Sequence, residues 1–118
     1  MTVTKFVVIP EPLCINHNMC ATATGTLSTA IISAAKYAIT GRYLGIIVYF
    51  DNQDLCAVLD LQGQPCPVPV TVTSLTTCTL VKSNAPQSVN MVMTFVATNG
   101  SGDTIYCQTG TLMAVNCP

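Results

Sequence analysis

Charged residues are scarce in this sequence. They make up 8% of the 118 residues, whereas a soluble domain typically carries about a quarter. The fixed cations are Lys5, Lys36, Arg42 and Lys82, and they are scattered along the chain. A phosphate backbone is bound by a cluster of basic side chains, so the missing basic patch argues against a nucleic-acid partner.

Long apolar segments are also missing. The longest apolar run, Leu44 to Phe50, has the length of a strand, far below the roughly 18 residues of a membrane span. The N-terminal stretch MTVTKFVVIPEP alternates like a strand and lacks the apolar core of a signal peptide. We therefore expect that a signal, if the protein is secreted, has been removed, and that Met1 is not the natural start.

Motifs for catalysis or for a metal are lacking as well. No Gly-rich phosphate loop, no G-x-S-x-G and no C-x-x-C occurs, and His17 is the one histidine. A dyad of His17 with Cys14 or Cys20 is one interpretation, but a loop histidine is favoured over it. Asp51 and Asp54 flank a turn, which is favoured over a general acid/base pair. The sequence thus predicts no enzyme, no metal and no cofactor.

Cysteine, by contrast, is abundant. Seven cysteines in a chain of this length favour a disulfide framework in an oxidising compartment. The stretch DNQDLCAVLDLQGQPCPVP places Cys56 and Cys66 around a loop rich in Pro, Gly and Gln. On its own this stretch leaves a metal clip, a redox pair and a structural staple open. Because seven is odd, one thiol lacks a partner within this chain.

The remaining pattern is that of short strands. Thr, Val and Ile dominate, and turn residues recur at short intervals. Only STAIISAAKY offers a helical alternative, and we expect no more than a turn there. Seven or eight such strands predict an antiparallel sandwich rather than a barrel. The expected strands are 2–9, 20–28, a pair over 35–50 ending in a central strand, a region within 68–81, and a hairpin from 88 to 115 that turns at TNGSGD.

Strand alternation assigns one face of these strands to the interior. Met91, Met93 and Phe95 form one side of a strand, and Met suits surfaces that adapt to varied apolar partners. The small residues Ala21, Ala23, Gly25 and Gly41 are expected on the strands opposite, which indicates a gap between the sheets. An ordinary core and a cavity for an apolar ligand both remain open. The predicted wall comprises Leu27, Tyr37, Ile39, Tyr43, Ile46, Val48, Phe50, Met91, Met93, Phe95 and Leu112.

Asn99-Gly100-Ser101 matches the N-glycosylation acceptor pattern at the predicted hairpin tip. Asn99 is therefore a candidate glycosylation site. The pattern agrees with a secretory route, although it is short.

The order of these segments resembles a known family. The segments are PLCINHNMCATATGTLS, AKYAITGRYLGIIVYF, DNQDLCAVLDLQGQPCPVP with Cys followed by Pro, SNAPQSVN, and GDTIYCQTGTLMAV. Together they resemble the ML lipid-recognition domain. That family includes fungal phosphatidylglycerol/phosphatidylinositol transfer proteins, mite allergens and a Niemann–Pick cholesterol-transfer protein. The similarity is greatest to the fungal members and implies a single ML-type lipid-binding domain over residues 1–118.

The resemblance implies an all-β, immunoglobulin-like sandwich of two antiparallel sheets, stapled by disulfides, with an apolar cavity between the sheets. It implies the disulfides Cys14–Cys20 and Cys56–Cys66. The family pairs the cysteine of its last strand, here Cys107, with one near the N-terminus, and MTVTKFVVIPEP has none. We pair the two extra cysteines, Cys78 and Cys117, with each other. Because the disulfide between Cys107 and the N-terminal stretch is missing, the oligomeric state stays open.

The expected function is that of a secreted or lumenal protein that binds and transfers a phospholipid, fatty acid or sterol. Transient contact with membranes is expected, and a protein acceptor is unknown. The alternative is a secreted structural or protein-interaction module, such as a wall component or an antigen-like protein, without lipid transfer.

Overall fold

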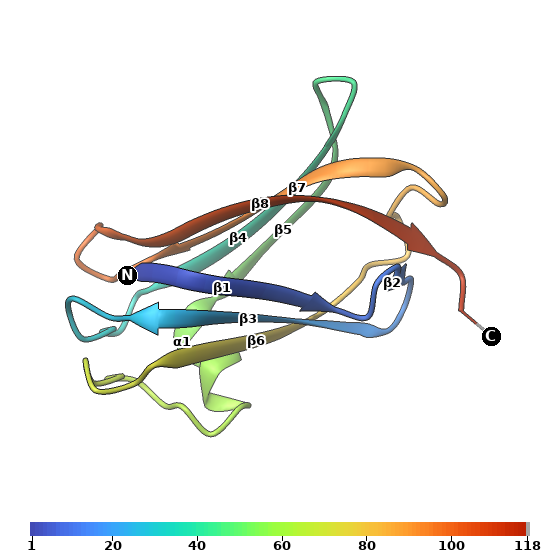
Figure 1. Cartoon of the computed structure of the whole chain (residues 1–118). Coiled ribbons are helices and arrows are strands. Elements are labelled where there is room, and N and C mark those ends of the chain that lie inside the picture. Colours follow the sequence, from blue (N-terminus) through green and yellow to red (C-terminus); the bar gives the residue numbers. More distant parts are fainter. Residues whose placement is uncertain (118) are drawn as a thin grey trace.

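A computed structural model describes residues 1–117 and forms two stacked β-sheets (Figure 1). The three-stranded sheet has the order β1-β3-β6, and the five-stranded sheet has the order β2-β8-β7-β4-β5. The predicted all-β sandwich is confirmed. The strands are β1 (Thr2–Ile9), β2 (Leu13–Cys14), β3 (Asn18–Thr26), β4 (Lys36–Tyr43), β5 (Ile46–Asp54), β6 (Ser74–Leu80), β7 (Asn90–Thr98) and β8 (Thr104–Val115).

Strand β3 shows how alternation builds the sandwich. Ala21 and Ala23 are buried against the other sheet, while Thr22 lies on the outer face and hydrogen-bonds Thr76 of β6 at 3.1 Å between the hydroxyl oxygens. Gly25 permits the close approach of β1, because a Cβ there would lie 1.9 Å from the backbone oxygen of Thr2. These contacts hold β1, β3 and β6 together in the three-stranded sheet.

The β4–β5 hairpin departs from the predicted register. A bulge between Gly41 and Arg42 shifts the pairing, so that Gly41 lies opposite Tyr49. Tyr49 and Asp51 therefore face the interior, and their neighbours face outward. The run predicted as a central strand is in fact the edge strand of its sheet. Tyr43, Ile46 and Phe50 are exposed and Val48 is half-buried, so their assignment to an interior wall was wrong.

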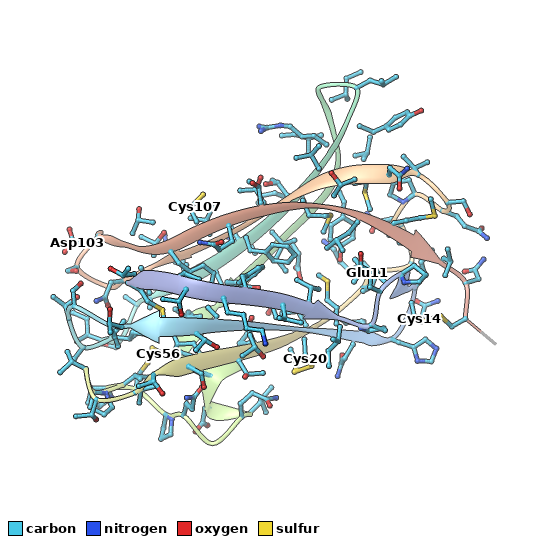
Figure 2. The ribbon with its side chains drawn as sticks, in the orientation of Figure 1. Glu11, Cys14, Cys20, Cys56, Asp103 and Cys107 are labelled. Atoms are coloured by element: carbon cyan, nitrogen blue, oxygen red, sulfur yellow. A yellow bond between two sulfur atoms is a disulfide. The ribbon has the colours of Figure 1, made fainter. Side chains whose placement is uncertain are left out.

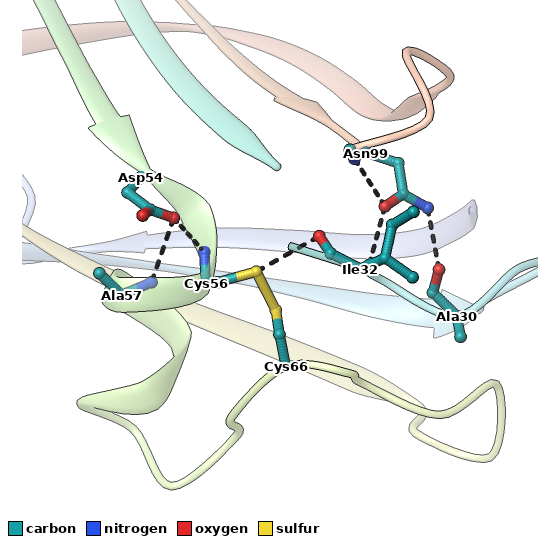
Figure 3. Close-up of a disulfide and its surroundings, with 8 residues drawn as sticks. Ala30, Ile32, Asp54, Cys56, Ala57, Cys66 and Asn99 are labelled. Carbon is teal, nitrogen blue, oxygen red and sulfur yellow. Dashed lines mark hydrogen bonds between the residues drawn. A yellow bond between two sulfur atoms is a disulfide. The ribbon is translucent and has the colours of Figure 1, made fainter. Parts of the chain in front are cut away.

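A short helix, α1 (Leu55–Asp60), lies in the segment that we predicted to be a loop. The Asp54 carboxylate caps it by accepting hydrogen bonds from the backbone N–H groups of Cys56 at 3.0 Å and Ala57 at 3.4 Å (Figure 3). Leu55 and Leu59 bury the inner side of the helix. An Asp directly before an apolar run is a helix-start signal, and it was missed. STAIISAAKY forms no helix, as expected.

The three disulfides are Cys14–Cys117, Cys20–Cys78 and Cys56–Cys66. The pairing of Cys56 with Cys66 is as the resemblance implied. The pairings Cys14–Cys20 and Cys78–Cys117 were wrong. The chain crosses from one sheet to the other between β2 and β3, which separates Cys14 from Cys20. Each of these two cysteines therefore forms its disulfide with a cysteine close to it in its own sheet or just beyond that sheet's last strand.

The register explains both corrected disulfides. Cys20 lies directly opposite Cys78 in the β3–β6 pair, with the two Cα atoms 4.1 Å apart. Cys14 pairs with Val115 in the parallel β2–β8 bridge, which brings it beside Cys117. The Cys14–Cys117 bond spans 103 positions and so joins the N-terminal part of the chain to the end of the last strand.

Cys107 is the free cysteine among residues 1–117. It lies on β8 and points away from the sandwich (Figure 2). The last strand is nevertheless tied to the N-terminal part of the chain, through Cys14 rather than through Cys107. The staple that the sequence seemed to lack is thus supplied from a different position.

Asn99 begins the β7–β8 turn but is buried, with 4% of its surface exposed. Its side-chain nitrogen donates to the Ala30 oxygen at 2.9 Å, and its side-chain oxygen accepts from the backbone N–H groups of Ile32 and Gly100 (Figure 3). N-glycosylation modifies that nitrogen, which is enclosed and occupied here. The Asn99 side chain thus belongs to the hydrogen bonding of the fold, and glycosylation at Asn99 stays a prediction.

Among residues 1–117, no helix is long and apolar enough to cross a bilayer.

Candidate functional site

Most of the predicted wall lies between the sheets. The members with at most 9% of their surface exposed are Leu27, Tyr37, Ile39, Met91, Met93, Phe95 and Leu112. Alternation was therefore sufficient for β7, β8 and the first part of β4. It failed on the β4–β5 hairpin, because the bulge changes which residues of β5 face inward and because Tyr43 and Ile46 lie at the exposed end of the hairpin.

The gap that we predicted opposite the methionines is filled. Gly41 lies on β4, in the same sheet as Met91 and Met93, and a Cβ there would lie 3.0 Å from the sulfur of each. The methionine side chains therefore cover the glycine. In this state the interior is packed by side chains, and a ligand enters only if some of them move.

A groove lies where β1 passes β8. It is a hollow of about 380 Å³ between the edge of the three-stranded sheet and the inner face of the five-stranded one. The residues that line it are Phe6, Val7, Val8 and Glu11 on one side and Phe95, Thr109, Gly110, Thr111 and Leu112 on the other.

Gly110 creates much of this hollow. It occupies an inward position of β8, two residues before the buried Leu112, and a Cβ built on it would meet no atom within 4 Å. A side chain at this position would fill the space. Gly110 was missed in the sequence, although a glycine at an inward position of a strand signals close approach of another group.

The groove is apolar at its inner end and polar at its rim. The rings of Phe6 and Phe95 lie at the inner end, with their centroids 5.4 Å apart. Glu11 is the charged residue of the lining, and Thr109 and Thr111 add hydroxyls. The arrangement suits an apolar molecule with an uncharged polar end. A negative head group would be repelled by Glu11, and the lining contains no cation to bind it.

The opposite side, where β5 passes β6, is closed by polar contacts. The Tyr49 hydroxyl donates to the Leu80 oxygen at 3.4 Å and accepts from the Lys82 backbone N–H at 3.1 Å. The Lys82 ammonium donates to the Phe50 oxygen and lies 3.8 Å from the Asp51 carboxylate. Burial raises the pKa of Tyr49, so the hydroxyl stays protonated and keeps its donor role.

Three hydroxyls meet between the sheets. Thr77 of β6 and Tyr37 of β4 lie 3.0 Å apart, oxygen to oxygen, and Thr77 also lies 3.4 Å from the Ala21 carbonyl oxygen. Tyr106 of β8 approaches both closely enough to influence the pKa of Tyr37, but its hydroxyl has no hydrogen-bond partner among the described residues. Burial raises the pKa of Tyr37 and of Tyr106, so both hydroxyls stay protonated.

A second hollow, of about 330 Å³, lies at the surface where β4 begins and β5 ends. Its lining combines Ala34, Ala35 and Lys36 with Asn52, Gln53 and Asp54. Asp54 already caps α1. The hollow shows none of the aromatic lining that the β1–β8 groove has.

The family model that describes the ML domain matches residues 1–113. The chain belongs to the ML-domain family. The ML domain is a lipid-binding domain, and the family assignment agrees with the apolar groove and with the two-sheet fold. The predicted resemblance is thereby confirmed.

A solved structure shares the fold. It is the crystal structure of a Niemann–Pick type C2 protein from the Japanese carpenter ant, with a TM-score of 0.70 over 95% of this chain and 90% of that one. The two sequences are 15% identical, so this likeness concerns the fold alone. No curated protein matches the sequence at a significant level.

Proposed function

We propose that this ML domain, comprising residues 1–118, is a secreted or lumenal lipid carrier that takes up one amphiphile between its two sheets. The observation that carries the proposal is the β1–β8 groove, whose apolar inner end reaches Phe95 of the interior. Six cysteines in disulfides support an oxidising compartment. No catalytic role is proposed.

Burial of apolar surface drives the binding. Each methylene group withdrawn from water contributes about 0.8 kcal/mol, so an acyl chain or a sterol needs no ionic anchor. We infer that the lipid enters past Phe6 and Phe95 and displaces the flexible side chains of Met91 and Met93, which adapt to varied shapes. The predicted wall residues that are buried then line the lipid.

The β4–β5 hairpin supports transient contact with a membrane. It projects from the sandwich (Figure 1), and Leu44 and Ile46 at its tip are 83% and 68% exposed. Tyr43 and Ile47 add apolar surface beside them. Arg42 pairs with Val92, which pairs in turn with Thr111 of the groove lining, so the hairpin and the groove lie at the same end of the strands.

A double substitution tests the role of the hairpin. Leu44→Asn with Ile46→Asn removes two exposed apolar side chains, and Asn tolerates the positive φ of Leu44. We expect binding to phosphatidylcholine vesicles and lipid transfer between them to fall at least tenfold, because burial of two such side chains is worth about 3 kcal/mol or more. Leu61→Asn is the control, since Leu61 is 79% exposed outside the hairpin.

Unchanged vesicle binding by the folded double variant would remove the hairpin from the mechanism. Uptake of lipid from a cyclodextrin complex involves no membrane. It should therefore persist in both variants.

The carrier proposal itself is tested by native mass spectrometry of the purified protein, followed by organic extraction and identification of the lipid. We expect a phospholipid, fatty acid or sterol at about one molecule per chain. A protein that is empty as purified and also refuses fluorescent fatty-acid and sterol analogues would contradict the proposal.

The second candidate is a secreted structural or protein-interaction module. The filled space at Gly41 and the apolar hairpin tip favour it, because a packed core and an exposed apolar patch suffice for binding another protein. The extraction experiment separates the two candidates. An empty protein whose hairpin variant loses a protein partner would favour the interaction module.

A further inference from the structure

The buried hydroxyl of Tyr106 lacks a partner in an otherwise apolar interior. The residue is 3% exposed, and its hydroxyl lies close to those of Tyr37 and Thr77 without forming a hydrogen bond of normal length and angle with either. Buried polar groups are nearly always paired, and each exception calls for an explanation. Tyr106 belongs to the five-stranded sheet and faces Thr77 of the three-stranded sheet, so the hydroxyl lies where a ligand between the sheets would pass.

The geometry of the three hydroxyls leaves one of them unpaired. Thr77, Tyr37 and Tyr106 each carry one hydroxyl proton. Thr77 donates to the Ala21 oxygen and Tyr37 donates to Thr77, or Thr77 donates to Tyr37. In either arrangement Thr77 and Tyr37 keep lone pairs that can accept a proton, but the Tyr106 hydroxyl forms no hydrogen bond of normal geometry with them. A single added oxygen atom with a lone pair would give the Tyr106 hydroxyl a hydrogen-bond acceptor.

The groove leads toward this position. Phe6 lines the groove, and its ring centroid lies 5.8 Å from that of Tyr106. Gly110 and Tyr106 both occupy inward positions of β8, four residues apart, which corresponds to about 13 Å along a strand. A lipid that enters beside Gly110 and displaces the Phe6 ring therefore reaches the hydroxyl with a body of ordinary lipid length.

The acceptor must be uncharged. The cluster holds neutral hydroxyls, and the carboxylate of Asp51 is the charged group among the described residues that influences the pKa of Tyr37. A buried carboxylate or phosphate here would lack a cation and would be repelled by Asp51. A hydroxyl or carbonyl oxygen carries the lone pair without that cost.

We propose that Tyr106, together with Tyr37 and Thr77, forms an internal recognition site for a hydroxyl or carbonyl oxygen of a bound neutral lipid. The inference rests on the proposed carrier function and deepens it. It adds a second determinant of specificity, since affinity would depend on an oxygen at the inner end of the lipid as well as on apolar length.

The first test concerns the protein without ligand. Tyr106→Phe removes an unpaired donor, so we expect the midpoint of thermal unfolding to rise by about 2–5 °C. Tyr37→Phe is the matched control, because it removes a paired hydroxyl and should lower the midpoint. A drop for Tyr106→Phe would mean that this hydroxyl already has a partner, such as an ordered water, and would overturn the proposal.

The second test uses two matched pairs of probes delivered from cyclodextrin: 5α-cholestan-3β-ol against 5α-cholestane, and hexadecan-1-ol against hexadecane. We expect the unmodified protein to retain the oxygenated member of at least one pair about two- to tenfold better, and Tyr106→Phe to lose that preference. Equal retention by the unmodified protein overturns the proposal and requires no variant. So does a preference that survives in Tyr106→Phe.

Failure of this inference differs from failure of the carrier proposal. A protein that binds lipids but does not favour either oxygenated probe contradicts only the internal site. A protein that takes up no lipid of any kind contradicts both.

Discussion

The two open sides of the sandwich are held together in different ways. On the β5–β6 side, Tyr49 and Lys82 form hydrogen bonds that join one sheet to the segment following the other. On the β1–β8 side, rings and aliphatic chains surround a groove, and one hydrogen bond, from the Met1 ammonium to the Ile105 oxygen at 2.7 Å, lies outside the groove lining. Hydrogen bonds must be broken before the two sheets can separate. Apolar contacts, by contrast, can be exchanged for those of a ligand.

This difference determines which side can open. A lipid that enters at the groove of the β1–β8 side replaces apolar contacts with apolar contacts, and the Met1–Ile105 hydrogen bond lies outside the groove lining. A lipid that enters at the β5–β6 side must break hydrogen bonds to Tyr49 and expose the buried Asp51, and each unpaired buried group costs about 1–3 kcal/mol. We therefore treat β5–β6 as the hinge side and β1–β8 as the opening side.

Removal of a disulfide is expected to have the largest effect on the difference between the two sides. Cys14–Cys117 joins the chain just beyond the groove, and its loop spans 103 positions. Replacing both cysteines by Ser should lower the free energy of unfolding by about 5 kcal/mol on the chain-entropy model. Cys56→Ser with Cys66→Ser is the control, because that bond spans 10 positions and should cost about 3 kcal/mol.

Urea denaturation of both double variants measures the difference. We expect the Cys14/Cys117 variant also to exchange the backbone amides of β1 faster than those of β6. If the two double variants lose equal stability, the opening side does not depend on its disulfide.

How far the sequence was informative depended on local regularity. Alternation placed Ala21, Ala23 and Phe95 correctly, because regular strands have a side-chain period of two. It misplaced Phe50, because the bulge at Gly41 shifts every later residue of β5 by one position. Nothing in the letters RYLGI marks that bulge.

The cysteines and the groove required three-dimensional information. Cys14 and Cys20 are close in sequence but lie on different sheets, so sequence distance pointed to the wrong pair. The groove depends on the missing side chain of Gly110 together with β1 from the other end of the chain. The unpaired hydroxyl of Tyr106 is likewise a property of its neighbours, which no spacing pattern encodes.

Filling the groove should block uptake without unfolding the domain. Gly110→Trp places an indole where a Cβ meets no atom within 4 Å. We expect lipid uptake from cyclodextrin to fall at least tenfold, because the bulky ring occupies the path past Phe6. Native mass spectrometry of the protein–lipid complex measures the change.

Thr104→Trp is the control for Gly110→Trp, since Thr104 is exposed on the same strand and outside the groove lining. Normal uptake by a folded Gly110→Trp protein would show that the lipid enters elsewhere. The assignment of the opening side would then fail, even though the family assignment would stand.

The smallest expected effect concerns the hinge side. Tyr49→Phe removes the hydroxyl that accepts from the Lys82 backbone N–H at 3.1 Å, so the free energy of unfolding should fall by about 1–2 kcal/mol. Tyr43→Phe is the control, because Tyr43 is 43% exposed and a surface change of this kind stays within about 0.5 kcal/mol. Lipid uptake should be unchanged in both variants, since neither residue lines the groove. Faster uptake by Tyr49→Phe would mean that the β5–β6 side also opens, and the contrast between the two sides would then be one of degree.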